Sequence, residues 1–329
     1  MSLSVKRRTA AVFLCAMWMA APALAAIEGR FDRTLAVTGP VTLSATSGSG
    51  GIEINAGQDG SVHVVGVIRG SSWSPGGSAE EIDRAVREIE ARPPIVQQGN
   101  QVRIGELEDE RIGRLVSISF TITVPRQTGV STNTESGSQT IAALAGPVTI
   151  ASGSGAITVG RIENAVQVRT GSGSIKVEGA GHGVAAETGS GSIRIGAVTG
   201  DTRVKTGSGS IDVQHVSAPS AQVSSGSGHI RIAALDGGVT ADTASASIEI
   251  AGNPTAGWRA TTSSGSITLA IPGGTPFKLQ ARTQSGSIRT DHTLQTSATG
   301  KHELEGTVGG GGALVEARSS SGSINVTRR

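Results

Sequence analysis

The 329-residue sequence has very little cysteine and very few aromatic residues. It contains one cysteine, Cys15, no tyrosine, four phenylalanines and three tryptophans. A single cysteine excludes an intrachain disulfide and a zinc site built from several cysteines. An aromatic content of 2% excludes a core built around large rings. Any core must therefore be filled by small, β-branched and leucine side chains.

Long apolar stretches are also missing, apart from one near the start. Lys6-Arg7-Arg8 precedes an apolar stretch over residues 9–21, and Ala23-Leu24-Ala25 supplies the small residues that signal peptidase requires. We expect residues 1–25 to be a signal peptide that is cleaved after Ala25. The apolar stretch is short for a transmembrane helix. The expectation is an exported protein, in the periplasm, on the cell surface or secreted, with no stable membrane span in the mature chain.

The sequence has no large excess of either charge. The whole chain carries 28 basic and 26 acidic residues, which gives a formal net charge of +2. Three of the basic residues and none of the acidic ones lie in the predicted signal peptide, which leaves 25 basic against 26 acidic residues. A chain with this balance lacks the basic surface that nucleic acids require, so we expect no nucleic-acid partner.

Glycine is abundant, with 48 residues, and it recurs at fixed intervals. The phrase Thr-Gly-Ser-Gly-Ser-Ile occupies residues 170–175, 188–193 and 206–211, a spacing of 18 residues. Looser copies end at Ile52, Ile141, Ile157, Ile230, Ile248, Ile267, Ile288 and Ile324. A fixed period of this length is typical of a repeat architecture. We interpret the 36-residue gap before Ile324 as two units, one of which has lost the phrase.

Each unit contains two short stretches in which apolar and polar residues alternate. Ile175 and Val177 begin one of them, and a second stretch contributes Val168. Alternation with a period of two indicates strands with one buried face, and strands this short gain stability only by stacking on their copies. The predicted fold is all-β: a single parallel β-solenoid (a β-helix or β-roll) with coils of about 18 residues. Its core should contain one column formed by Ile193, Ile211, Ile230 and Ile248.

The same register makes a prediction about charges. Arg169, Glu187 and Lys205 precede successive phrases, so they should be direct neighbours of alternating sign on the outside of the solenoid.

The third position of the phrase is serine in every copy. Among these serines are Ser154, Ser172, Ser190, Ser208, Ser227, Ser245, Ser264 and Ser285. One interpretation is an exposed hydroxyl ladder that binds a ligand. The other is a structural turn ladder, in which each hydroxyl bonds backbone groups at its own corner. We favour the structural interpretation, because a ligand site should spare some coils. The glycine that follows most of these serines indicates a corner with positive φ or close backbone approach.

One segment departs from the repeat. Ser78-Ala79-Glu80-Glu81 forms a capping box, and Pro93-Pro94 ends the helical pattern that follows it. We predict one helix near residues 78–91, within an insertion over about residues 70–115 that covers the N-terminal end of the core. The alternating segment 115–124 predicts a strand.

The chain resembles the bacterial putative-adhesin family of exported β-solenoid domains. The resemblance is carried by the segment from Phe31 to Val37, by Val124-Pro125 at the end of a strand, and by the serial Ser-Gly-Ser-Ile phrases. It implies one solenoid domain over residues 26–329. The family supplies no catalytic residues to carry over.

The sequence contains no motif of an enzyme active site, a cofactor site or a metal site, and its six histidines are scattered. We expect a non-catalytic surface or periplasmic protein that acts as an adhesin or scaffold. A polysaccharide-active β-helix enzyme and a Ser/Thr ladder that binds ice or crystals are the alternatives. Trp73 and Trp258 are candidate carbohydrate platforms, although packing is the commoner role of isolated tryptophans. A cell-envelope component, a glycan or another protein stay open as partners.

Overall fold

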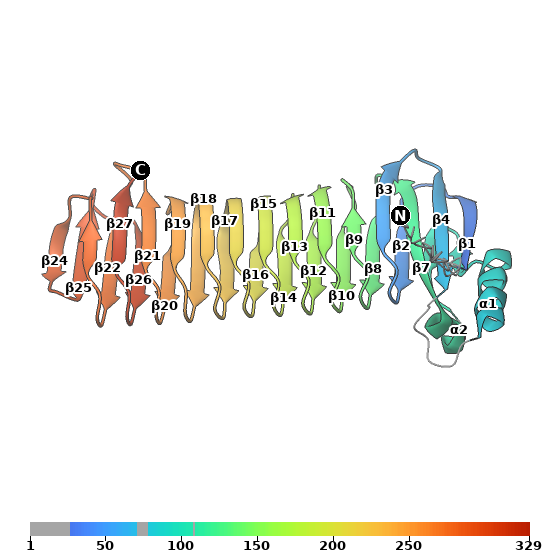
Figure 1. Ribbon diagram of the computed structural model, residues 1–329. Helices are drawn as coiled ribbons and strands as arrows, with labels where there is room; N and C mark the ends of the chain where they lie inside the picture. Colours follow the sequence, from blue (N-terminus) through green and yellow to red (C-terminus); the bar gives the residue numbers. More distant parts are fainter. Residues whose placement is uncertain (1–26, 71–77, 108) are drawn as a thin grey trace, which may run out of the picture.

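A computed structural model describes residues 27–70, 78–107 and 109–329. The predicted signal peptide and Trp73 lie outside these ranges. The described chain is all-β apart from two short helices, and most of its strands are parallel and stacked along one long axis (Figure 1). The predicted all-β, solenoid-like fold is confirmed.

One side of the stack, here called the valine face, is built from the strand that precedes each turn phrase. Neighbouring strands pair in parallel, with Val148, Val166 and Val184 in one register column. The strands of its main part are β2 (Thr42–Ser47), β8 (Gly129–Thr134), β10 (Val148–Ser152), β12 (Val166–Thr170), β14 (Val184–Thr188), β16 (Thr202–Thr206), the second halves of β17 (Ile211–Ser225) and β18 (Ile230–Thr243), and β20 (Trp258–Thr262).

The other side, here called the isoleucine face, is built from the strand that follows each phrase. Ile193, Ile211, Ile230 and Ile248 pair in one register column, and each is at most 1% exposed. The predicted isoleucine column is confirmed. The strands of its main part are β3 (Ile52–Gly57), β9 (Gln139–Ile141), β11 (Ile157–Ile162), β13 (Ile175–Ala180), β15 (Ile193–Thr199), the first halves of β17 and β18, β19 (Ile248–Asn253) and β21 (Ile267–Ile271).

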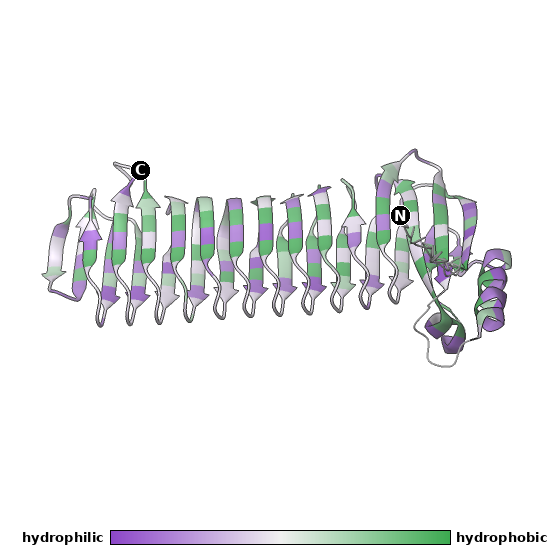
Figure 2. Cartoon of the chain, viewed as in Figure 1, coloured by the Kyte–Doolittle hydropathy of each residue, from purple (hydrophilic) through white to green (hydrophobic). Residues whose placement is uncertain are grey.

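The alternation along each strand separates the core from the surface. On β13, Ile175 and Val177 are buried, whereas Lys176 and Glu178 are exposed. Figure 2 shows the corresponding alternation of apolar and polar bands along the stacked strands. The apolar side chains of both faces form one continuous buried cluster. Burial of each isoleucine contributes about 1.5–3 kcal/mol, so the stack depends mainly on these columns.

The polar side chains that point outward also form straight rows. Arg169, Glu187 and Lys205 pair as direct neighbours on β12, β14 and β16. Each of the two cations lies 3.7 Å from a carboxylate oxygen of Glu187. The predicted charge ladder is confirmed, although exposed pairs of this kind contribute little stability.

The copy of the phrase that we placed at Ile141 is wrong by two residues. Ile157 pairs with Gln139, and Val159 pairs with Ile141. The isoleucine column is therefore occupied by a fully buried glutamine in this coil, and the third-position serine is Ser136 rather than Ser138. The register in this coil is set by the turn from Thr134 to Gln139 and not by the position of the nearest isoleucine.

The C-terminal end does not follow the order of the sequence. Its strands are β22 (Phe277–Thr283), β23 (Ile288–Thr290), β24 (Gln295–Thr299), β25 (Glu303–Val308), β26 (Ala313–Ser319) and β27 (Ile324–Arg328). β25 lies antiparallel to β22, and β24 lies antiparallel to β25. The interpretation of the 36-residue gap as a coil without the phrase is thus wrong, because the gap contains this antiparallel hairpin.

The N-terminal end is covered by antiparallel strands and helices. β4 (Ser61–Gly70) lies between β1 (Glu28–Ala36) and β7 (Val116–Pro125), and β7 pairs with β3. Beside them lie β5 (Ile95–Gln98), β6 (Gln101–Ile104), α1 (Ala79–Ala91) and α2 (Glu110–Leu115).

The predicted helix is confirmed as α1, including its capping box at Ser78 and Glu81. A second helix, α2, and the pairing of β6 with β2 were not predicted. The segment 70–115 therefore contributes two things: β6 extends the valine face, and α1 lies at the N-terminal end of the stack (Figure 1). Among the described residues, no helix is long and apolar enough to cross a membrane.

Candidate functional site

The turn of each phrase is held by its first residue. The Thr188 hydroxyl donates a hydrogen bond to the Gly173 carbonyl oxygen of the preceding coil (2.9 Å) and accepts one from the Gly191 N–H of its own turn (3.2 Å). Thr206 and Ser225 make the same pair of bonds. This position carries a hydroxyl in all the described turns: Ser47, Thr134, Ser152, Thr170, Thr188, Thr206, Ser225, Thr243, Thr262, Thr283 and Ser319. A row of hydroxyls, buried except for the half-buried Ser152, therefore lies along the turns, and those of Thr188, Thr206 and Ser225 bond the preceding coil.

The serines at the third position occupy the outside of the turns. Ser154, Ser172, Ser190, Ser208, Ser227, Ser245, Ser264 and Ser285 are all exposed. Within the described ranges, none of their hydroxyls makes a hydrogen bond to another residue, although several of their backbone N–H groups bond the preceding coil. They do lie in a row at the turns. The expectation that their hydroxyls bond the corner is wrong, because the inward-pointing first residue reaches those backbone groups instead.

The glycine at the fourth position is required by close approach rather than by positive φ. None of the positive-φ glycines falls at this position. A Cβ on Gly191 would overlap the Gly173 carbonyl oxygen of the coil below, and Gly209 stands in the same relation to Gly191. Where Ala246 replaces this glycine, the Thr243 hydroxyl keeps its bond to the Gly228 carbonyl oxygen. No N–H bond from residue 246 to that hydroxyl is present in the described structure.

We expect Thr188→Val to lower the free energy of unfolding by about 1–3 kcal/mol. The substitution keeps the shape of the side chain, but it leaves the Gly173 carbonyl and the Gly191 N–H without a partner in a buried turn. Ser190→Ala, two residues away, should change stability by less than about 0.5 kcal/mol, because its hydroxyl is exposed. Urea unfolding followed by circular dichroism measures both. Equal losses for the two variants would contradict the assignment of the turn bonds.

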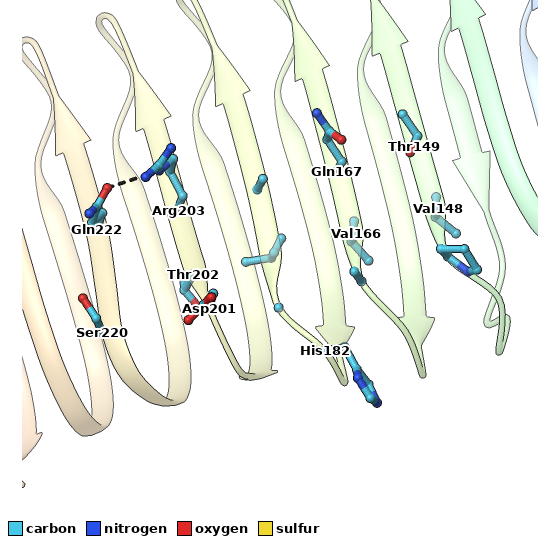
Figure 3. A pocket seen from close by; sticks show the side chains of 15 residues that line it. Val148, Thr149, Val166, Gln167, His182, Asp201, Thr202, Arg203, Ser220 and Gln222 are labelled. Atoms are coloured by element: carbon cyan, nitrogen blue, oxygen red, sulfur yellow. Dashed lines mark hydrogen bonds between the residues drawn. The ribbon is translucent and has the colours of Figure 1, made fainter.

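A shallow hollow crosses the outer surface of the valine face (Figure 3). The outward column over β10, β12, β14, β16 and β17 contains Thr149, Gln167, Ala185, Arg203 and Gln222. The small side chain of Ala185 leaves space between its longer neighbours. Ala185, together with Ala165 and Gly183 near the beginnings of the strands, supplies the small residues that line the hollow.

The groups around this hollow form a varied set of hydrogen-bond donors and acceptors. The Arg203 guanidinium donates to the Gln222 side-chain oxygen (3.2 Å), which orients both side chains along the surface. Asp201 lies directly before β16, Ser220 directly before the second half of β17, and His182 at the turn before β14; all three line the hollow (Figure 3). Amide, hydroxyl, carboxylate and guanidinium groups next to the β-sheet surface are suited to a ligand rich in hydroxyl groups.

The other residues considered from the sequence do not gather at one place. Of the six histidines, His182 lies at the hollow, whereas His215 lies in register with Ala197 on the isoleucine face. Trp258 is 1% exposed, and its indole N–H donates to the Gly237 carbonyl oxygen (2.9 Å), so it is a core residue and not a carbohydrate platform. In the described ranges, no three His, Cys, Asp or Glu side chains are grouped so that they could hold a metal ion.

Comparisons with known proteins identify the family of this chain. The model of the Toastrack family (DUF4097) matches residues 90–327. A putative adhesin from Bacteroides fragilis shares 14% identity, with 91% of this chain and 97% of that chain covered and a TM-score of 0.36. A putative lipid binding protein from Parabacteroides distasonis shares 13% identity, with 91% and 96% covered and a TM-score of 0.39. No curated protein matches this chain.

Proposed function

Since the chain belongs to the Toastrack family, DUF4097, we propose that it is a non-catalytic exported protein that acts as an adhesin-like scaffold in the periplasm or at the cell surface. It binds a neutral, hydroxyl-rich polymer of the cell envelope along the valine face. The observation that carries this proposal is the hollow at Ala185, which has the polar side chains of Gln167 and Arg203 on its two sides in the same outward column.

The geometry of the stack supports a polymer rather than a small isolated ligand. Parallel coils repeat about every 4.8 Å, so outward groups recur along a straight surface. A polymer that lies on such a surface makes many weak hydrogen bonds at once, and its affinity grows with the number of units in contact.

The charges along the valine face support a neutral polymer. Glu187 lies between Arg169 and Lys205 and interacts with both. Next to the hollow, Asp201 and Arg203 carry opposite charges. The potentials of neighbouring opposite charges largely cancel, and salt screens what remains beyond about 8 Å at physiological ionic strength, so this surface does not favour a strongly charged partner.

A screen of the protein from residue 26 onward against neutral and acidic polysaccharides tests the proposal. We expect saturable binding to a neutral polysaccharide, tighter for long chains than for short oligomers, without release of new reducing ends. Shortened polymer after incubation would support an enzyme instead. Thermal hysteresis in the same preparations would support an ice-binding ladder, and absence of binding to any polysaccharide would contradict the proposal.

A further inference from the structure

The last coil of the chain lies between two coils that precede it in the sequence. β26 pairs in parallel with β20 on one side and with β22 on the other, so Trp258, Val315 and Leu279 form one register column. β27 is likewise placed between β21 and β23. Figure 1 shows β26 and β27 inside the stack, with β24 and β25 beyond them. The chain therefore leaves a slot one coil wide and returns to fill it.

A glycine linker leads into this coil. Residues 309–312 are all glycine, and the first three have φ values of 57°, 82° and 89°. The Gly311 N–H donates to the Val308 carbonyl oxygen (3.0 Å), and a Cβ on Gly310 would meet no heavy atom within 4 Å, so the linker is one short turn with an open tip. Glycine adopts these and many other conformations at little cost, so the linker can reorient the coil relative to the strands before it.

The hairpin beyond the slot has its own stabilising contacts. Arg282 of β22 lies 2.7 Å from a carboxylate oxygen of Glu303 and 2.8 Å from one of Glu305, both on β25. The charge of Glu303, its hydrogen bond and then Glu305 raise the pKa of Arg282. Strands β22, β25 and β24 therefore pair with one another without the last coil, whereas β23 pairs, among the described strands, only with β27 of that coil.

One ion pair makes the slot specific for this coil. Glu316 is almost completely buried, with a side-chain exposure of 6%, and it accepts from the Arg259 Nε of β20 (2.9 Å) and pairs with Arg318. If β22 stacked directly on β20, Gln280 would take the place of Glu316 opposite Arg259. The acidic side chain thus favours the inserted coil over direct stacking of its two neighbours.

We propose that residues 313–328 are an exchangeable segment and that a second copy of this chain supplies it. The same coil from a second copy would make the same contacts in the slot, and the glycine linkers would cross between the two molecules. The product is a symmetric dimer joined at the C-terminal ends of two stacks, as in domain swapping. This inference does not depend on the proposed ligand.

Cysteine pairs test the exchange directly, because the chain from residue 26 onward has no cysteine. Thr268 lies on β21, beside the slot, and Asn325 lies on β27, which fills it. The two residues are register neighbours, and both point outward. The variants Thr268→Cys and Asn325→Cys are mixed, incubated below their melting temperature and oxidised. Thr158→Cys and Lys176→Cys form the matched control, since they are neighbours on β11 and β13 inside the continuous stack.

We expect at least tenfold more disulfide-linked heterodimer from the slot pair than from the control pair. Deletion of Gly310 and Gly311 should increase it further, because a short linker hinders return of the coil to its own slot. Equal heterodimer yields from the two pairs would overturn the proposal. The double variant Thr268→Cys/Asn325→Cys should form an intrachain disulfide in the monomer, and failure to do so would overturn the register on which the proposal rests.

Discussion

Replacement of Ile211 by aspartate is expected to unfold the central part of the protein. Ile211 is 1% exposed and pairs with Ile193 and Ile230 in the isoleucine column. A carboxylate at this site would lose its hydration without gaining a partner, and the apolar contacts of the isoleucine would disappear as well. We expect a loss of more than about 4 kcal/mol in the free energy of unfolding. Loss of the β-sheet signal in circular dichroism at 25 °C, or a greatly lowered melting temperature, would report this.

Gln214→Asp is the matched control, because Gln214 is exposed on the same strand. It introduces the same charge on the outside, where we expect a change of less than about 1 kcal/mol. An Ile211→Asp variant as stable as the Gln214→Asp variant would show that the register of the isoleucine face is wrong.

Gly191→Ala is expected to destabilise the protein by about 1–3 kcal/mol or more. The added Cβ would overlap backbone atoms of residues 173 and 174, so a whole turn of the neighbouring coil has to move rather than one flexible side chain. The shift would also disturb the hydrogen bond from the Gly191 N–H to Thr188.

Gly48→Ala provides the comparison for this variant. Gly48 lies in the first turn of the stack, and a Cβ at this position meets no heavy atom within 4 Å. We expect its thermal unfolding to match that of the wild type within about 2 °C. If the Gly191→Ala and Gly48→Ala variants had the same melting temperature, the turns would not be stacked as closely as described.

The repeat allowed the main register to be predicted because the turn phrase has a constant length. The residue that begins the next strand lies five positions after the first-position hydroxyl in every described turn, from Ser47–Ile52 to Ser319–Ile324. Differences in length are taken up at the opposite turn, for example between Ala218 and Ala221. The isoleucine column and the ladder of Arg169, Glu187 and Lys205 follow directly from this constancy.

Two predictions, the register at Ile141 and the role of the third-position serines, were wrong because each depended on one residue type instead of the whole phrase. Gln139 fits the buried column because its side-chain amide donates to the Thr134 hydroxyl and the Ala151 carbonyl oxygen, so a polar residue takes the place of isoleucine. The inward role of Thr188 is hard to predict because the first position varies between serine and threonine, whereas the third position is always serine. The burial alternation of the preceding strand, which makes every second residue inward, would have indicated it.

Two features could not be predicted from the repeat. Insertion of β26 and β27 between earlier coils depends on long-range pairing, for which the sequence order gives no signal. The hollow depends on Ala185 standing between Gln167 and Arg203, three residues that are 18 positions apart and become neighbours only through the register. An outward column in which an alanine stands between glutamine and arginine is the pattern that could have indicated it.

Binding of a neutral polysaccharide to Arg203→Ala tests the central claim most directly. Arg231→Ala is the control, because Arg231 is also exposed but lies on the isoleucine face. For the polysaccharide that binds the wild type, we expect Arg203→Ala to weaken binding at least tenfold with an unchanged melting temperature, whereas Arg231→Ala binds as the wild type does. The polymer should be recovered at its original length. Equal binding by the two variants, or a shortened polymer, would contradict a non-catalytic binding surface on the valine face.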